Sequence, residues 1–129
     1  MMNRKQTVGI FGERRVARHY ALRFYRIRKK NYKIGHCELD LIVENRKAVV
    51  FVEVKTRTQD PNDKSLLPPS FAVNYEKRQH LIRAARAYLG IHPTQKTVRF
   101  DIAEVFTEIK KNGKPRLRTL RIIKDAFHA

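Results

Sequence analysis

Two β-rich segments separated by only three residues constrain the fold of this chain more than any other feature. Residues 37–44 and 48–55 are dominated by Leu, Ile, Val and Phe, and a short polar stretch beginning at Asn45 joins them. Parallel strands need a crossover of a dozen or more residues, so a connection this short predicts an antiparallel hairpin. Asn45 suits its turn because Asn tolerates the backbone conformations that tight turns require.

Hydrophobic periodicity divides the rest of the chain into further helices and strands. The expected elements are a helix at 7–25, a short basic edge strand at 27–32, a helix at 74–89 that Asn74 caps and Gly90 ends, and strands at 97–106 and 117–123 joined through Asn112-Gly113. Residues 56–70 are rich in Thr, Gln, Asp, Asn and Pro, which predicts a mobile loop within the domain. This order predicts a single α/β domain over residues 1–129, with a central mixed β-sheet flanked by helices.

Positive charge is the main compositional clue to function. The chain has 29 Lys plus Arg against 12 Asp plus Glu, which gives a formal net charge of +17. Such a charge repels itself in the folded state unless a polyanion is bound, so nucleic acid, most simply DNA, is the expected partner. An acidic membrane surface fits less well because the basic residues are spread along the whole chain. Lysines and arginines that only keep the protein soluble are the plain alternative.

Cysteine content and hydropathy indicate a cytoplasmic protein. Cys37 is the single cysteine of the chain, so no internal disulfide can form and a reducing compartment is expected. No apolar run approaches the roughly 18 to 20 residues that cross a bilayer, and none of signal-peptide length follows the amino terminus. We therefore expect no membrane association.

Several of the scarce carboxylates fall on the first hairpin. Side chains alternate between the two faces of a strand, so Glu38 and Asp40 are expected on one face and Leu39 on the other. Glu53 and Lys55 share one face of the partner strand in the same way. A two-residue turn would pair Glu38 with Glu53, and a register shifted by two residues would pair Asp40 with Glu53. In either register Asp40 and Glu53 are opposite or diagonal, about 5 to 8 Å apart.

Clustered carboxylates repel one another, and a divalent cation removes that penalty. Carboxylate oxygens without a Cys-His cluster favour Mg²⁺ or Mn²⁺ over zinc. Lys55 would then place a positive charge beside an attacking water or a developing phosphate charge, an arrangement suited to phosphodiester hydrolysis. The alternative is an ion pair between Glu53 and Lys55 on a solvated face, with Glu38 and Asp40 facing water.

Three charged residues outside the hairpin are candidates for nearby roles. Glu13 falls on or beside the inward stripe of the first helix, where a carboxylate is costly unless it is paired or bound to a cation. Arg57 follows Lys55 closely and is either a phosphate clamp or an ordinary exposed arginine. Asp101, in a later strand, is expected to be a structural ion-pair partner or hydrogen-bond acceptor, and the alternative is that it orients a group near the site.

These residues resemble the PD-(D/E)xK nuclease superfamily, whose members share a restriction-endonuclease-like core, and within it the YraN family of uncharacterised bacterial proteins. The likeness covers nearly the whole chain. It is carried by Gly12-Glu13 with Ala17, Asn31-Tyr32, Glu38-Leu39-Asp40-Leu41-Ile42, Phe51-Val52-Glu53-Val54-Lys55-Thr56-Arg57, Ala72-Val73 with Lys77, Ala85 with Tyr88-Leu89, and Arg99-Phe100-Asp101.

The resemblance implies a role for each matched residue. It makes Asp40 and Glu53 the metal ligands, Lys55 the catalytic lysine, and Glu13 a helix carboxylate like that of the archaeal Holliday-junction resolvases. Glu38 becomes a supporting or alternative metal ligand.

Nucleic-acid contacts are expected at Lys77, which matches the family, and at Lys33, which departs from it. Lys77 is implied to touch substrate phosphate. Lys33 stands where the family usually has arginine, which keeps the charge and loses bidentate phosphate recognition. Cys37 stands where the family usually has glycine, which puts the backbone geometry beside the ligands in question.

The function expected from residues and resemblance together is a Mg²⁺- or Mn²⁺-dependent endonuclease that hydrolyses DNA, with branched or damaged DNA as the substrates considered. A homodimer is a plausible assembly because one active site cuts one strand. Two other classes stay open. One is a nucleic-acid-binding protein of the same fold that does not cleave, and the other is an adaptor that binds an acidic protein.

Overall fold

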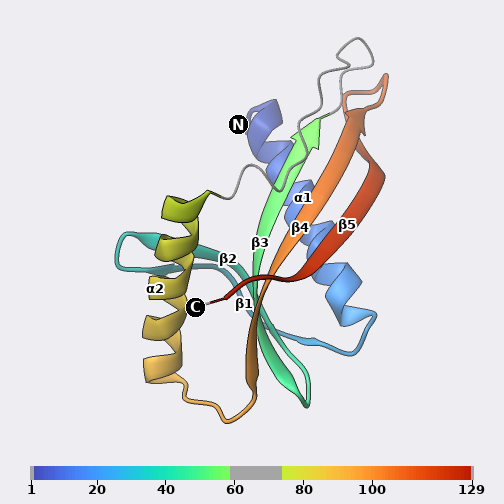
Figure 1. Cartoon of the computed structure of the whole chain (residues 1–129). Coiled ribbons are helices and arrows are strands. Elements are labelled where there is room, and N and C mark those ends of the chain that lie inside the picture. Colours follow the sequence, from blue (N-terminus) through green and yellow to red (C-terminus); the bar gives the residue numbers. More distant parts are fainter. Residues whose placement is uncertain (1, 59–73, 129) are drawn as a thin grey trace.

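A mixed five-stranded sheet runs through the part of the chain that the structure, a computed structural model, describes, which is residues 2–58 and 74–128 (Figure 1). The elements follow one another as α1 (Arg4–Ala21), β1 (Arg26–Ile34), β2 (Cys37–Glu44), β3 (Ala48–Thr58), α2 (Tyr75–Ile91), β4 (Thr97–Ile109) and β5 (Pro115–Phe127). The strands keep their chain order across the sheet, and β3 and β4 run parallel while their outer neighbours are antiparallel. The predicted single α/β domain with a flanked mixed sheet is confirmed, and it agrees with a restriction-endonuclease-like core.

Helix α1 covers one face of the sheet and begins earlier than periodicity predicts. Asn3 and Gln6 form a capping box, in which each side chain accepts a hydrogen bond from the other's backbone N–H, so the helix starts at Arg4. The helix ends at Ala21, and Phe24 then adopts a positive φ of 67° in the turn that follows. The predicted end at residue 25 is therefore wrong by one helical turn, because the periodic apolar pattern continues through residues that leave the helix.

Close packing of α1 on β3 depends on Gly12. A Cβ atom built on this residue would overlap the side chain of Thr56, so no other residue fits without moving the helix or the strand. The buried side of α1 packs with the apolar residues of the sheet into one core cluster, which includes Val16, Ala17 and Tyr20. Gly12 thereby brings its neighbour Glu13 close to the carboxyl end of β3.

Helix α2 covers the opposite face and provides the crossover between the parallel strands β3 and β4. Asn74 caps it as predicted, with its side chain accepting from the Lys77 N–H at 2.9 Å. Gly90 does not end the helix, which continues to Ile91. The prediction failed there because Gly90 keeps helical geometry, and a glycine marks a helix end only where it adopts a left-handed conformation.

The second of the two predicted registers joins β2 and β3. The ladder runs from Leu41 opposite Val52 to Glu44 opposite Val49, so continuing it would place Asp40 opposite Glu53. The turn lies at residues 46–47, where the Asn45 side chain accepts hydrogen bonds from the N–H groups of Lys47 and Ala48.

The alternation expected along β2 is wrong at Leu39. Leu39 and Ile42 both pack in the core cluster on the α2 side, whereas Leu41 and Val43 pack on the α1 side. An uninterrupted strand would have put Leu39 with Leu41. The strand alternation is therefore broken between Leu39 and Ile42, where the described ladder between β2 and β3 also ends.

The later strands are longer than predicted, and β3 continues through Thr58. The loop expected from residue 56 was therefore placed too early, because Thr56, Arg57 and Thr58 pair with β4. Residues 59–70 of that predicted loop lie outside the described residues. The Asn112-Gly113 hairpin is confirmed, with Gly113 at a positive φ of 83°. None of the described helices combines the length and apolar character that crossing a membrane requires.

Candidate active site

Glu53 is the centre of the candidate site because it is a buried carboxylate with an unpaired oxygen. It is 4% exposed on β3, and its Oε2 atom has no hydrogen-bond partner among the described residues. The other oxygen, Oε1, lies 3.4 Å from Lys55 Nζ and 3.6 Å from Lys77 Nζ. Burial raises the pKa of Glu53 to about 7, and Lys77 and Lys55 oppose the rise. Asp40 adds to it through its charge and through a hydrogen bond that Glu53 can donate to it when protonated, so Oε2 lacks a donor only while both carboxyls are ionised. A buried acid with a free oxygen is unfavourable unless something binds there.

Asp40 lies at the point where β2 separates from β3. Its Oδ2 atom accepts a hydrogen bond from the Val54 N–H at 2.9 Å. The side chain thus provides the acceptor for Val54 just beyond the last described pair of the ladder, Leu41 with Val52. The separation matters because it leaves a gap between the two strands at the two carboxylates. A continuous ladder would close that gap.

Glu13 reaches the same area from α1. Asn31 of β1 donates from Nδ2 to Glu13 Oε2 at 3.2 Å. Partial burial raises the pKa of Glu13, the Asn31 hydrogen bond opposes the rise, and the charges of Asp40 and Glu38 add to it. Glu13 is half-buried, which confirms its predicted position on or beside the inward stripe, and it lines the same cavity as Asp40.

Two lysines from different elements face the acids. Lys55 comes from β3, and Lys77 comes from the first turn of α2, where its backbone is held by the Asn74 cap. Sequence reasoning reached Lys77 only through the resemblance, because no pattern in the chain links residue 77 to residue 53. The packing of α2 on the sheet makes that link.

The structure does not bring every predicted residue to the cluster. Glu38 is exposed and acts on Glu13 only through its charge, so its role as a metal ligand stays a prediction. Lys33 is exposed on the edge strand β1, opposite Glu38. Arg57 lies two residues beyond Lys55, and its Nε atom is buried without a hydrogen-bond partner among the described residues. The nucleic-acid contacts expected of Lys33 and Arg57 are likewise still predictions.

Two residues near the site were missed. Asn31 has a left-handed backbone, with φ at 49°, which Asn tolerates better than most residues. Glu104 of β4 is 1% exposed and lies opposite Lys55 in the parallel ladder. Its Oε1 atom has no described hydrogen-bond partner, and its Oε2 atom is 3.8 Å from Arg121 Nε. Glu53 was identified from the carboxylates clustered on the hairpin and from its spacing to Lys55. Glu104 has only its apolar neighbours in the strand as a signal, and these could have predicted its burial.

The donor set of the site suits a hard cation with few protein ligands. Within residues 2–58 and 74–128, no three His, Cys, Asp or Glu side chains converge closely enough to hold a metal by themselves. Mg²⁺ is commonly held by one or two carboxylates while it keeps several waters, and Mn²⁺ also prefers oxygen ligands. Asp40 with the unpaired oxygen of Glu53 fits that pattern and does not fit a zinc site.

Comparison with known proteins assigns the chain to a family. Residues 12–105 match the uncharacterised protein family UPF0102. The chain is 37% identical to a UPF0102 protein of Caldicellulosiruptor bescii, a match that covers 98% of this chain and 100% of the relative. It is 38% identical to a UPF0102 protein of Caldanaerobacter subterraneus, over 83% of this chain and 85% of the relative, and 35% identical to one from Bacteroides thetaiotaomicron, over 94% and 92%. The resemblance seen in the sequence is therefore confirmed, and the chain belongs to the uncharacterised protein family UPF0102, the YraN family.

Proposed function

We propose that this protein is a metal-dependent nuclease that hydrolyses phosphodiester bonds of DNA. The observation that carries the proposal is Glu53, a buried carboxylate with one oxygen unpaired among the described residues, which lies beside Asp40 and within 3.4 and 3.6 Å of two lysines. Buried carboxylate oxygens are normally hydrogen-bonded, so the oxygen of Glu53 that has no partner among the described residues supports a site that binds a ligand. The net charge of +17 supports a polyanionic substrate.

Asp40 and Glu53 are the residues that would hold Mg²⁺ or Mn²⁺. When bound there, such an ion supplies Lewis-acid polarisation of the phosphoryl group and a more acidic water. Lys55 Nζ, 3.4 Å from Glu53, is placed to donate a hydrogen bond to a phosphate oxygen that approaches the carboxylates. Lys77 Nζ, 3.6 Å from the same carboxylate, adds a second positive charge from helix α2. Glu13, which accepts a hydrogen bond from Asn31, supports the site from the α1 side.

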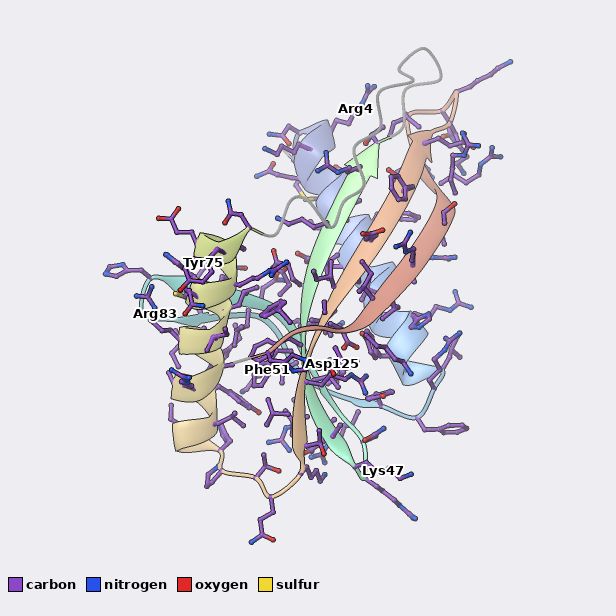
Figure 2. The ribbon with its side chains drawn as sticks, in the orientation of Figure 1. Arg4, Lys47, Phe51, Tyr75, Arg83 and Asp125 are labelled. Carbon is purple, nitrogen blue, oxygen red and sulfur yellow. The ribbon has the colours of Figure 1, made fainter. Side chains whose placement is uncertain are left out.

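The proposal is tested by incubating the purified protein with linear, single-stranded and four-way-junction DNA, with and without Mn²⁺. We expect cleavage that requires the metal. Asp40→Asn and Lys55→Ala should each lower the rate by at least about a hundredfold, the usual effect of removing a group that stabilises transition-state charge. Lys47→Ala is the matched control, because Figure 2 shows Lys47 at the tip of the β2–β3 hairpin, far along the molecule from α1's first turn at Arg4.

Two results would count against a nuclease. Cleavage by Asp40→Asn and Lys55→Ala at the control rate would show that these residues do not carry the reaction. Absence of cleavage of all three substrates at high protein concentration would favour the second candidate function, a nucleic-acid-binding protein that does not cleave. The positive charge supports that candidate equally, and its affinity for DNA should fall steeply with salt.

The proposal also names two specific binding partners. DNA and a second copy of this chain are the partners we propose, the latter because each site cuts one strand. Sedimentation of the protein alone and with junction DNA measures the assembly, and a monomer in both samples would exclude the dimer.

A further inference from the structure

Two cavities next to the candidate site share Glu13 in their walls. The larger, of about 620 Å³, lies between the first turns of α1 and the carboxyl end of β3. The smaller, of about 270 Å³, lies between α1, β1 and β2 and includes Asp40 and Asn31 in its wall. Glu13 lines both. The larger cavity therefore adjoins the candidate site through Glu13 and Lys55, and the smaller one adjoins it through Glu13 and Asp40.

The larger cavity has two kinds of wall. Arg4, Lys5 and Lys55 supply positive charge, while Val8 and Val54 supply apolar surface. Neither Arg4 nor Lys5 forms an ion pair with any other described residue. Unpaired cations beside an apolar surface match the two parts of a nucleotide, its phosphate and its base.

Gly9 leaves the space of this cavity open. It lines the cavity, and a Cβ atom built on it meets nothing within 4 Å. Glycine in a helix is unfavourable by about 1 kcal/mol relative to alanine, so nothing in the helix itself favours it here. Its effect is to leave room between the first two turns of α1 and the end of β3.

The two cavities differ in what they can hold. The larger one is within the range of roughly 300 to 1,000 Å³ that is typical of sites for small organic ligands, and the smaller one is below it. The smaller cavity has Arg14 and Lys30 in its wall, so it suits a phosphate and its sugar. Of these two cavities, only the larger has room for a base.

We propose that the larger cavity binds one unpaired nucleotide of a DNA strand, next to the phosphate that lies at the carboxylates. This inference rests on the proposed function and adds the substrate class to it. A paired base is stacked within its duplex and cannot enter a cavity unless it is extruded at a cost of a few kcal/mol. The protein therefore prefers strands with unpaired nucleotides at the bond to be cut, such as single strands, ends and branch points.

The test fills the cavity without touching a charged group. Gly9→Leu places a side chain in the open space and increases helix propensity, so it should fold at least as stably as the wild type. Gly90→Leu is the matched control, because Gly90 lies in α2, away from the cavity, and a Cβ there also meets nothing within 4 Å. Gly9→Ala adds a second control that changes helix propensity and fills little space. Thermal unfolding checks that all three variants are folded.

Fluorescence anisotropy then measures the affinity of each protein for a labelled oligothymidine and for a blunt duplex, in EDTA at low salt. We expect Gly9→Leu to bind the single strand at least tenfold more weakly and the duplex as the wild type does, while Gly90→Leu and Gly9→Ala match the wild type on both. Equal affinities of Gly9→Leu and Gly90→Leu for the single strand would overturn the proposal. So would an equal loss on single strand and duplex, or a wild type that binds no single strand.

The outcome separates this inference from the proposed function. If the wild type cleaves DNA while Gly9→Leu binds the single strand normally, only the nucleotide site is wrong. If the expected binding pattern is found and no DNA is cut, only the nuclease is wrong.

Discussion

Asp101 of β4 and Glu53 of β3 are buried carboxylates on neighbouring strands, and the fold surrounds them in opposite ways. Val52 pairs with Asp101, so the two acids lie at nearly the same level of the sheet but face different helices. Asp101 accepts hydrogen bonds from Tyr20, from Arg99 and from the Asp125 N–H, at 2.7 to 3.1 Å. Glu53 has two longer ion pairs and an oxygen with no described partner. The saturated carboxylate stabilises the fold, and the unsaturated one has capacity left for a ligand.

The largest expected effect is on the saturated side. Asp101→Asn removes the charge that pairs with Arg99, and the arginine then stays largely buried without a counter-ion. Breaking one partner of a buried ion pair usually costs about 3 to 5 kcal/mol, so the free energy of unfolding should fall by that amount. Urea unfolding measures it.

Asp125→Asn is the control for this change, since its side chain is half exposed and outside the cluster. It should shift stability by at most about 0.5 kcal/mol. If the free energy of unfolding falls no more in Asp101→Asn than in this control, then Asp101 and Glu53 do not differ in the way that their hydrogen bonds indicate.

The next largest expected effect is an increase in stability, on substitution of Glu53. The pKa of Glu53 is about 7 in the folded protein and 4.5 as its ordinary value. A carboxyl whose folded pKa is raised contributes stability below pH 4.5 that is lost as the pH rises through 7, because the native state holds the proton longer than the unfolded state. Glu53→Gln has no such titration. Without divalent metal at pH 8 it should be more stable than the wild type by about 3 kcal/mol, the equivalent of this pKa difference.

Urea unfolding of wild type and Glu53→Gln at pH 5 and pH 8, in EDTA, checks the sign. The advantage of the variant should be small at pH 5 and large at pH 8, and Mn²⁺ should reduce it at pH 8 by stabilising the wild type alone. A variant that is less stable than the wild type at pH 8 would show that Glu53 is as well satisfied as Asp101.

The sequence was sufficient to predict those features of Glu53 and Asp101 that local patterns determine. The hairpin allows few registers, so Asp40 and Glu53 were placed opposite or diagonal, and Asp101 was correctly expected to be structural. The break in alternation at Leu39 was missed, because a strand pattern assumes that pairing continues and here a side chain, Asp40, replaces a backbone partner.

Other features of the site depend on tertiary packing. The approach of Lys77 to Glu53 requires α2 to lie across the sheet, and no spacing in the chain encodes that distance. The left-handed conformation of Asn31 could not be predicted from the sequence either, since a single Asn in a basic stretch has many possible roles. The burial of Glu104 was within reach, as its apolar neighbours in β4 already favoured an inward strand.

Asn31, at the edge of the site, has both a backbone role and a hydrogen bond to Glu13, and two substitutions separate these roles. Asn31→Ala places a Cβ-bearing residue without a polar side chain at a φ of 49°, which should cost about 1 kcal/mol more than Asn31→Gly. Both variants lose the hydrogen bond to Glu13, and that bond favours the charged carboxylate. The pKa of Glu13 should therefore rise equally in both, as measured by NMR titration. Equal stabilities of the two variants would show that the backbone conformation is not what Asn contributes.

The smallest effect isolates one hydrogen bond of the saturated carboxylate. Tyr20→Phe removes the hydroxyl that donates to Asp101 Oδ2 and keeps the ring that packs in the core. That oxygen still accepts from Arg99 at 3.1 Å, so the charge stays paired and no buried group is left alone. We expect a loss of about 1 kcal/mol in urea unfolding, the usual net value of a hydrogen bond. A loss as large as that of Asp101→Asn would mean that Tyr20, rather than Arg99, is what makes burial of this carboxylate tolerable.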